Sequence, residues 1–268
     1  MQLYIGCSGW SYSSWQGPFY PSSVTSSSFL HYYSKAFDYV EIDSTFYRIP
    51  NSFMVRKWAR TTPENFRFTA KFPKVITHDK RLENVDRELD EFLQAIVPLN
   101  EKTLCLLIQL PPFLTITKGL ELLQQLVPQL DKRFRYAVEV RHPSWFQDLT
   151  YNYFAKERIS MVWSQLADIQ TPPIVTTDFL YLRFIGDRTI DPKDFGTIQK
   201  DRIKEMEYWA NEVKKVQQDE EKNLKLAIAS ANNHYAGFGP MTANIFRSMM
   251  GLPEAEWEEK KQPTLSDF

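Results

Sequence analysis

Strand-like and helix-like segments alternate along nearly the whole sequence, and this alternation limits the folds open to the chain more than any other feature. Runs of alternating or continuous apolar residues predict eight strands. They lie at residues 3–8, within 37–50, and at 66–72, 103–110, 135–141, 160–163, 180–185 and 224–229. Eight strands alternating with helices over about 250 residues indicate an α/β fold of the (β/α)8 TIM-barrel type.

The predicted helices lie between most of these strands. They are residues 26–37, 50–60, 84–97, 118–130, 144–158 and 197–218, with a last helix beginning at Pro240. Ser144 stands where it would cap the fifth of them. The segment QTPPIVTTD at residues 170–178 has no helical period, so the barrel is expected to be irregular between strands six and seven. A doubly wound sheet is the rival fold, but no G-x-G-x-x-G turn follows the first strand.

The length and composition suit one barrel domain at residues 1–251, followed by a C-terminal tail at 252–268. With 43% hydrophobic residues, a chain of 268 residues can bury a core of that size. The N-terminal sequence MQLYIGCSGW has no basic region followed by an apolar one, and the longest apolar runs are short and broken by proline. We therefore expect a cytoplasmic protein without a membrane segment. The net charge of −1 gives no overall attraction to nucleic acid or anionic lipid.

Polar residues gather late in the predicted strands or just beyond them. They are Ser8, Glu41, Asp43, Lys71, Gln109, Glu139, Arg141, Arg183, Asn232 and Asn233, joined by the loop histidines His78, His142 and His234. In a TIM-type barrel the C-terminal ends of all strands meet at one mouth, where active sites are built. The aromatic residues around Glu41 and Asp43 predict that these carboxylates face an enclosed space, where their burial must be compensated.

Several roles follow from these residue types. Glu41 and Glu139 could serve as general base and acid if their environments separate their pKa values. Lys71 could bind an anion or, once desolvated, act as a nucleophilic amine. Arg141 and Arg183 suit a carboxylate or a phosphate, and the turn at residues 232–239 offers backbone donors ahead of a helix.

Other interpretations of the same residues stay open. The charges could form a self-neutralising network that only fills the barrel. A divalent metal on Glu41, Asp43, Glu139, His142 or His234 is the alternative to an anion site, but three cations in the same mouth argue against it, so no metal or cofactor is predicted. Trp10 and Tyr47 could stack a sugar or a base, although isolated aromatic residues more often serve packing.

The sequence as a whole resembles a known family. The segments IGCSGWSYSSWQGPFYP, FDYVEIDSTFYRIP, FRFTAKFPKVITH, QLPPF, VEVRHPSW and YLRFIG and the Asn-Asn-His turn occur in the order found in the YecE-like family, known as domain of unknown function 72. The resemblance implies a TIM-type barrel with no established reaction; a relation to sugar isomerases is an analogy of fold. It places the family's polar mouth on Glu41, Tyr47, Arg48, Lys71, His78, Gln109, Glu139, Arg141, Arg183 and Asn233. Two residues depart from the pattern, Asp43 where asparagine is common and Ile185 where histidine is common.

The tail carries a second motif. Gln262, Leu265 and Phe268 resemble the Q-x-x-L-x-x-F peptides that dock on DNA sliding clamps, with the two apolar side chains in a hydrophobic pocket. Three fixed positions often match by chance, and a plain disordered end is the alternative.

The sequence thus predicts an isomerase-like or hydrolase-like barrel enzyme acting on a small polar, anionic ligand such as a phosphorylated sugar or nucleotide. Glu41, Glu139 and Lys71 would carry the acid/base chemistry. One alternative is a nucleic-acid-processing or clamp-associated protein. Another is a ligand-binding module without turnover, which Ile185 favours.

Overall fold

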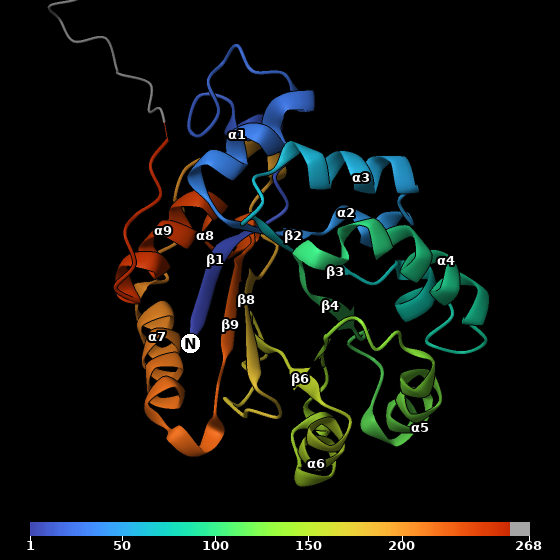
Figure 1. Cartoon of the computed structure of the whole chain (residues 1–268). Coiled ribbons are helices and arrows are strands. Elements are labelled where there is room, and N and C mark those ends of the chain that lie inside the picture. Colours follow the sequence, from blue (N-terminus) through green and yellow to red (C-terminus); the bar gives the residue numbers. More distant parts are fainter. Residues whose placement is uncertain (258–268) are drawn as a thin grey trace, which may run out of the picture.

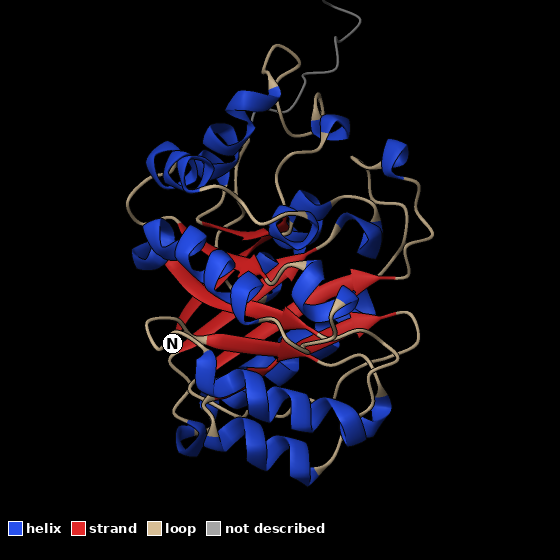
Figure 2. Cartoon of the chain, turned by 90° about the vertical axis from the view of Figure 1, so that its right-hand side faces the viewer, coloured by secondary structure: helices blue, strands red, loops and turns tan. Residues whose placement is uncertain are grey.

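The computed structural model describes residues 1–257 and contains one sheet of nine parallel strands in the order β6-β5-β4-β3-β2-β1-β9-β8-β7. Helices surround the sheet, and in Figure 2 the strand arrowheads all point to one side. The strands are β1 (Gln2–Ser8), β2 (Tyr39–Ile42), β3 (Arg67–Lys71), β4 (Thr103–Gln109), β5 (Tyr136–Glu139), β6 (Ile159–Met161), β7 (Trp163–Leu166), β8 (Phe179–Gly186) and β9 (Leu226–Ala231). The prediction of a TIM-type barrel is confirmed.

The predicted sixth strand is split in two, and this split forms the seam of the barrel. β6 pairs with β5, whereas β7 pairs with β8, and only Val162 separates the two short strands. Ser160 Oγ donates to Phe179 O across the seam at 3.0 Å. No helix is assigned between β7 and β8, as the Pro172-Pro173 segment predicts.

The remaining elements are mostly helices between the strands (Figure 1). The α-helices are α1 (Phe29–Ala36), α2 (Ser44–Tyr47), α3 (Ser52–Thr61), α4 (Asp86–Ile96), α5 (Ile116–Leu126), α6 (Asp148–Lys156), α7 (Ile203–Gln218), α8 (Asn233–Ala236) and α9 (Gly239–Met249). A π-helical turn covers Val75–Asp79 after β3. The short helices α2 and α8 follow directly on β2 and β9, so both lie at the C-terminal end of the barrel.

Two predicted helix starts were wrong. Ser144 does not cap the helix after β5, because its hydroxyl accepts from Ile116 N at 3.0 Å and so caps α5 instead. The helix that follows, α6, begins at Asp148. Likewise α7 begins at Ile203 rather than at residue 197, and the Asp201 carboxylate accepts from Ile203 N at that start.

The buried apolar residues form two clusters on the two sides of the sheet. The larger one lies between the strands and the helices, and includes Trp15, Phe72, Trp145 and Phe246. The smaller one includes Tyr39, Cys105, Leu107, Ala137 and Tyr181, whose positions in the strands alternate with those of the larger cluster, so it fills the barrel interior. The two cysteines, Cys7 and Cys105, are both free and buried.

The first residues of the predicted tail are tied to the barrel. Asn244 in α9 donates to Ala255 O and accepts from Ala255 N, at 2.9 and 2.7 Å. Trp257 Nε1 donates to Pro18 O at 2.9 Å. The described chain therefore ends in a segment held between α9 and the loop after β1.

Candidate functional site at the mouth of the barrel

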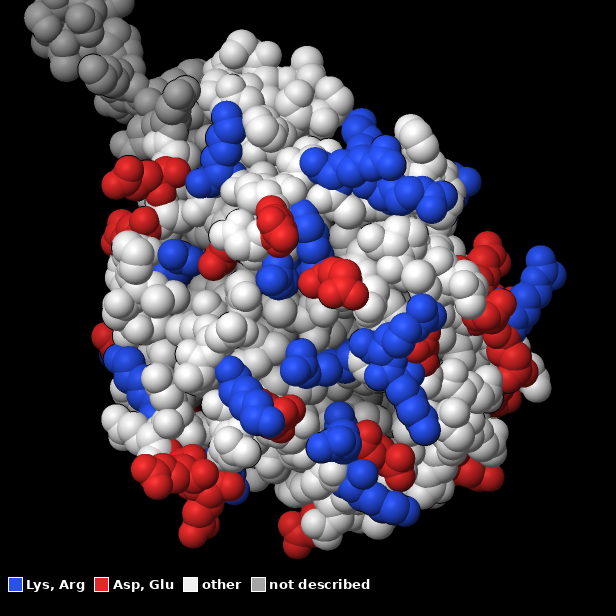
Figure 3. Space-filling model, in the orientation of Figure 1, with Lys and Arg blue, Asp and Glu red and all other residues white. Residues whose placement is uncertain are grey.

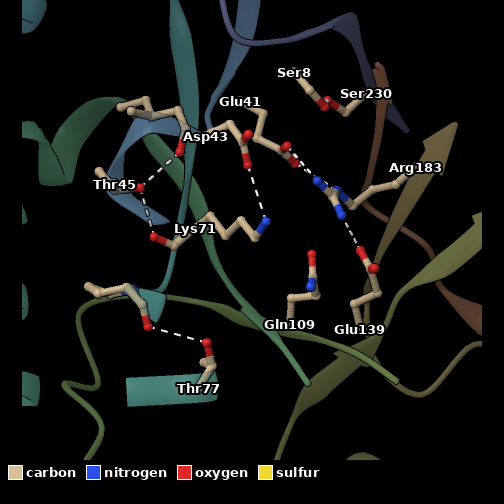
Figure 4. Close-up of polar contacts among 12 residues, drawn as sticks. Ser8, Glu41, Asp43, Thr45, Lys71, Thr77, Gln109, Glu139, Arg183 and Ser230 are labelled. Atoms are coloured by element: carbon tan, nitrogen blue, oxygen red, sulfur yellow. Dashed lines mark hydrogen bonds and ion pairs between the residues drawn. The ribbon is translucent and has the colours of Figure 1, made fainter. Parts of the chain in front are cut away.

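Alternation along the strands places a set of polar side chains inside the barrel, toward its C-terminal end. The set is Ser8, Glu41, Lys71, Gln109, Glu139, Arg183 and Ser230, and each is at most 4% exposed. Figure 4 shows Lys71, Gln109, Glu139 and Arg183 pointing into the same space. Sequence reasoning predicted this convergence for every member except Ser230, because the seven residues come from seven different strands whose C-terminal ends meet in a barrel.

Arg183 lies at the centre of the set and joins the two glutamates. Its Nη2 and Nε donate to Glu41 at 2.6 and 2.8 Å, and its Nη1 donates to Glu139. Arg141 Nε donates to the other oxygen of Glu139 at 2.5 Å. We call Glu41, Glu139 and Arg183 the ionic layer. Such burial is tolerated only because every charge has a hydrogen-bonded partner of opposite sign.

Two members of the ionic layer, Glu139 and Arg183, keep their charges over a wide pH range. Burial alone would raise the pKa of Glu139, but Arg141, Arg183 and Lys71 outweigh it and lower that pKa to about 2. Burial would likewise favour the neutral form of Arg183, yet Glu139 and Glu41 raise its pKa well above the usual value. Glu139 and Arg183 are therefore charged at neutral pH.

A second layer of hydroxyl groups lies beneath the ionic layer. The hydroxyls of Tyr39, Thr69 and Tyr181 lie within 2.8 to 3.0 Å of one another. Tyr181 also donates to Glu41, which links the two layers. Sequence reasoning missed this hydroxyl layer, although Tyr39 and Tyr181 stand two residues before Glu41 and Arg183 on the same face of their strands.

Lys71 has fewer partners than its burial would suggest. Its Nζ is 3.3 Å from Asp43 Oδ1 and lies 3.8 Å from the centre of the Phe46 ring. Thr45 Oγ1 donates to Lys71 O at 2.7 Å and to Ile42 O at 2.9 Å, and so ties α2 to the ends of β2 and β3. Burial lowers the pKa of Lys71, while Asp43 acts in the opposite direction.

His78 and Gln109 form a neutral pair beside the cations. His78 lies in the π-helical turn, where its Nδ1 is 2.8 Å from Thr77 Oγ1 and its Nε2 is 3.4 Å from Gln109 Nε2. Burial and the nearby Lys71 and Arg141 lower the pKa of His78 to about 4. Gln109 Oε1 is buried and accepts no hydrogen bond within the described chain. An unpaired buried acceptor in a cavity is a group that a ligand donor could satisfy.

A cavity of about 690 Å³ lies at the mouth, and Lys71 and Gln109 line it, whereas His78 does not. Its lining holds five cationic side chains, Lys71, Lys74, Arg141, Arg183 and Arg188, and one carboxylate, Asp43. The apolar wall comes from Phe46, Tyr47, Ile185 and Phe195. Glu41 and Glu139 are not part of the lining, because they are fully buried behind Arg183 and Arg141. The surface that a ligand would meet is therefore mainly cationic.

Only part of the predicted site lines this cavity. Asp43, Tyr47, Lys71, Gln109, Arg141, Arg183, Asn232 and His234 do. Trp10 packs edge-on against Trp58 with ring centres 5.8 Å apart, and Arg48 lies exposed beyond the lining. His142 accepts from Ser144 N in a turn, and Asn233 accepts from Trp15 Nε1 and Gly239 N, so these two residues hold local structure.

Loop residues that carry no strand period complete the lining. Tyr12, Lys74, Arg188 and Phe195 were not predicted. β8 ends at Gly186 with a φ of +77°, where a Cβ atom would lie 2.3 Å from His234 O. Phe195 lies edge-on to both Tyr12 and His234, with ring centres 6.1 and 4.9 Å apart, which closes this side of the mouth.

Within residues 1–257 no three His, Cys, Asp or Glu side chains come together as a metal site would require. No helix of this part of the chain is long and apolar enough to cross a membrane. The clamp-binding motif at Gln262, Leu265 and Phe268 lies outside the described residues.

Comparison with known proteins gives matches in sequence and in fold. UPF0759 protein YecE of Escherichia coli K12 is 34% identical over 144 residues, which cover 54% of this chain and 50% of YecE. UPF0759 protein YunF of Bacillus subtilis is 30% identical over 156 residues, 56% of this chain and 54% of YunF. The chain thus matches about half the length of these curated relatives.

Solved structures extend the comparison to nearly the whole chain. A DUF72 family protein of Thermotoga maritima has a TM-score of 0.79 at 27% identity, covering 94% of this chain and all of that one. A DUF72 family protein of Enterococcus faecalis has a TM-score of 0.77 at 21% identity, which shows a shared fold alone. The sequence profile described as "Protein of unknown function DUF72" matches residues 4–266. The chain therefore belongs to the DUF72 family, as the order of its motifs predicts.

Proposed function

We propose that this protein is a barrel enzyme that binds a small anionic ligand in the mouth and acts on it by acid/base chemistry. The observation that carries the proposal is the cavity lining, in which five cations face a single carboxylate. A cleft lined by one sign of charge concentrates ligands of the opposite sign. The cavity volume of about 690 Å³ suits a metabolite or a single nucleotide.

Arg183 and Arg141 would bind the anionic group. Both guanidinium groups are held from behind by glutamates, so they lose little further freedom when a ligand binds. Their planar forks match the geometry of a phosphate or carboxylate. In this interpretation Glu41 and Glu139 are positioning residues that fix the arginines.

The acid/base role is open to two assignments. The first gives it to Glu41 and Glu139, and it stays a prediction that requires Arg183 to move away from them. The second, which we favour, gives it to Asp43 and Lys71, whose oxygen and nitrogen are 3.3 Å apart and which both line the cavity. A proton-transfer group must reach the ligand, and the fully buried glutamates do not.

The polar groups beside the cations favour a ligand that carries hydroxyls. Gln109 Oε1 is a buried acceptor without a partner in the described chain, and the neutral imidazole of His78 lies next to it. An exposed aromatic residue, Tyr47, stands at the rim of the same cavity. Phosphorylated sugars and nucleotides combine these features, since they carry an anion, hydroxyls and a flat or apolar face.

Calorimetric titration with inorganic phosphate and a panel of sugar phosphates and nucleotides tests this proposal. We expect Arg188→Gln to weaken phosphate binding about fivefold, because it removes an exposed cation from the lining without touching the core. The matched control is Arg135→Gln, in a second cavity at the opposite end of the barrel, which should bind as the wild type does. Equal losses in both variants, or no binding of any anion, would refute the proposal. Binding without conversion of any ligand would favour a binding module without turnover.

A separate proposal concerns the sliding clamp. The described chain is tied to the barrel up to Trp257, so a clamp bound at residues 262–268 would be held close to the barrel. Deletion of residues 262–268 should abolish binding to a purified clamp, and unchanged binding would end this proposal.

A further inference from the structure

Lys71 makes fewer hydrogen bonds than Lys102, although its side chain is more buried. An ammonium group has three donors. Lys102 Nζ, although more exposed, donates to Ala59 O, Thr62 O, Thr62 Oγ1 and Pro63 O at 2.7 to 3.1 Å. Among the described residues Lys71 Nζ, with its side chain only 6% exposed, has one hydrogen-bond partner, Asp43, at 3.3 Å, and it lies 3.8 Å from the centre of the Phe46 ring. Lys71 therefore has unused hydrogen-bond donors although its side chain is nearly buried.

Of the carboxylates near Lys71, Asp43 is the one placed to accept its proton, because the two glutamates are bound by arginines. The charged groups with the largest effect on it are Asp43, which follows β2, Arg183 from β8, Glu41 from β2 and Glu139 from β5. Glu41 and Glu139 are occupied by the arginines. Burial lowers the pKa of Lys71, which increases the neutral, nucleophilic fraction of the amine at a given pH.

We infer that Lys71 forms an imine with the carbonyl carbon of a small aldehyde or ketone that carries a phosphate or carboxylate. This inference rests on the proposed function, because Arg141 and Arg183 would hold the anionic group. The substrate class thereby narrows to anionic oxo compounds, such as open-chain sugar phosphates. The surrounding geometry supplies an amine, a carboxylate at 3.3 Å and a free buried acceptor in one cavity.

The step balances without an external oxidant or reductant. Asp43 takes a proton from the Lys71 ammonium, and the free amine attacks the carbonyl carbon. A C–N bond forms while the C=O π electrons move to oxygen, and a proton passes from the attacking nitrogen to that oxygen to give a neutral carbinolamine. Asp43 then gives its proton to the leaving hydroxyl, water departs, and the nitrogen lone pair forms the C=N bond of a protonated imine beside the Asp43 carboxylate. Gln109 Oε1 would accept a hydrogen bond from the carbinolamine hydroxyl.

Chemical trapping tests the inference on the full chain. Pyridoxal 5′-phosphate, an aldehyde phosphate, and glyceraldehyde 3-phosphate are each added at equimolar concentration, followed by borohydride, which reduces C=N to a stable C–N bond. Peptide mapping by mass spectrometry then locates the adduct. We expect label on Lys71 in preference to Lys74, which lines the same cavity but has a side chain 52% exposed. The Asp43→Asn variant should be labelled about tenfold more slowly, and Lys71→Arg should lose the label.

The outcomes separate this inference from the proposed function. If phosphate binds and protects the cavity from reagent but the label falls on Lys74 or on surface lysines, the imine is refuted while the anion site stands. If phosphate neither binds nor protects, the proposed function fails as well. Because the mapping is done on the wild-type chain, a failure of Lys71→Arg to fold would not remove the test.

Discussion

Two cavities of about 690 Å³ lie at opposite ends of the barrel, and they differ in which side chains are buried in their walls. At the mouth, Lys71, Gln109 and Arg183 are buried and polar. At the other end, where β5, β6 and β8 begin, the buried lining is Leu130, Phe134, Tyr136, Ile159 and Phe179.

The charged residues of the second cavity are at the surface. Lys132, Arg135 and Arg158 are exposed, and Glu157 and Asp178 are partly exposed. Figure 3 views the molecule from the end at which the strands begin, and there basic and acidic side chains are interspersed over most of the surface. Solvated charges of both signs cost little to keep, whereas buried charges persist only with dedicated partners. Size alone therefore does not identify a site; desolvated polar groups do.

The largest effect is expected for Arg183→Met, which tests whether the two cavities differ in the cost of losing an arginine. It leaves Glu41 and Glu139 buried without their shared cation, so we expect a loss of about 3–5 kcal/mol in the free energy of unfolding. Urea denaturation at pH 7 measures it. The matched substitution at the other cavity, Arg135→Met, should cost less than about 0.5 kcal/mol, because Arg135 is exposed. Similar losses for both variants would mean that the two cavities do not differ in this respect.

Low pH should protonate Glu139 and so destabilise the folded protein. The pKa of Glu139 falls from 4.5 to about 2 on folding, so the unfolded chain takes up this proton first. The stabilisation is complete above pH 4.5 and is lost as the pH falls through 2, and it amounts to about 3 kcal/mol. Urea denaturation from pH 5 downward should show this loss in the wild type. In Glu139→Gln the dependence should be weaker by that amount; an unchanged dependence would contradict the assignment.

Thr69→Val probes the neutral hydroxyl layer. The valine keeps the shape of threonine but removes the hydrogen bonds to Tyr39 and Tyr181, which should cost about 1–2 kcal/mol. Phosphate affinity should not change, since Thr69 does not line the mouth. Weaker phosphate binding in this variant would show that the hydroxyl layer shapes the site as well as the fold.

The last prediction concerns the pKa of His78, which is measured on the wild-type protein. Its folded pKa of about 4 lies below the ordinary 6.5, so the ring is neutral in the folded protein at pH 6. This neutral ring stabilises the fold fully above pH 6.5, and the contribution is lost as the pH falls toward 4. NMR titration of the imidazole resonances should give a midpoint near 4, with His78→Gln assigning the signal. A midpoint near 6.5 would mean that the ring is solvated and away from the cations.

The alternation of residues in the strands predicted which side chains face the barrel interior, because period-2 order fixes the face of Glu41, Lys71, Glu139 and Arg183. It could not predict which groups a ligand meets. Arg183 covers Glu41 from 142 positions along the chain, and such pairing depends on rotamers and register rather than on local pattern.

Local sequence patterns also failed to predict the helix capped by Ser144 and the loop residues that line the mouth, for a related reason. Ser144 has the residue type of a helix cap, but it caps α5, a helix that begins 28 positions earlier in the chain. Arg188 and Phe195 lie in a segment without period, which follows the turn at Gly186 and lines the mouth. Where a partner is distant in sequence, tertiary contacts override local propensity.

Titration of phosphate into the triple variant Glu41→Leu, Glu139→Leu, Arg183→Met tests most directly whether the ionic layer serves a ligand rather than the barrel. Apolar replacement of a whole buried ion network is often neutral for stability, so this variant should unfold at a urea concentration near that of the wild type. Its phosphate affinity should fall at least about tenfold, because the central guanidinium is gone. A folded triple variant that binds phosphate as tightly as the wild type would contradict the account.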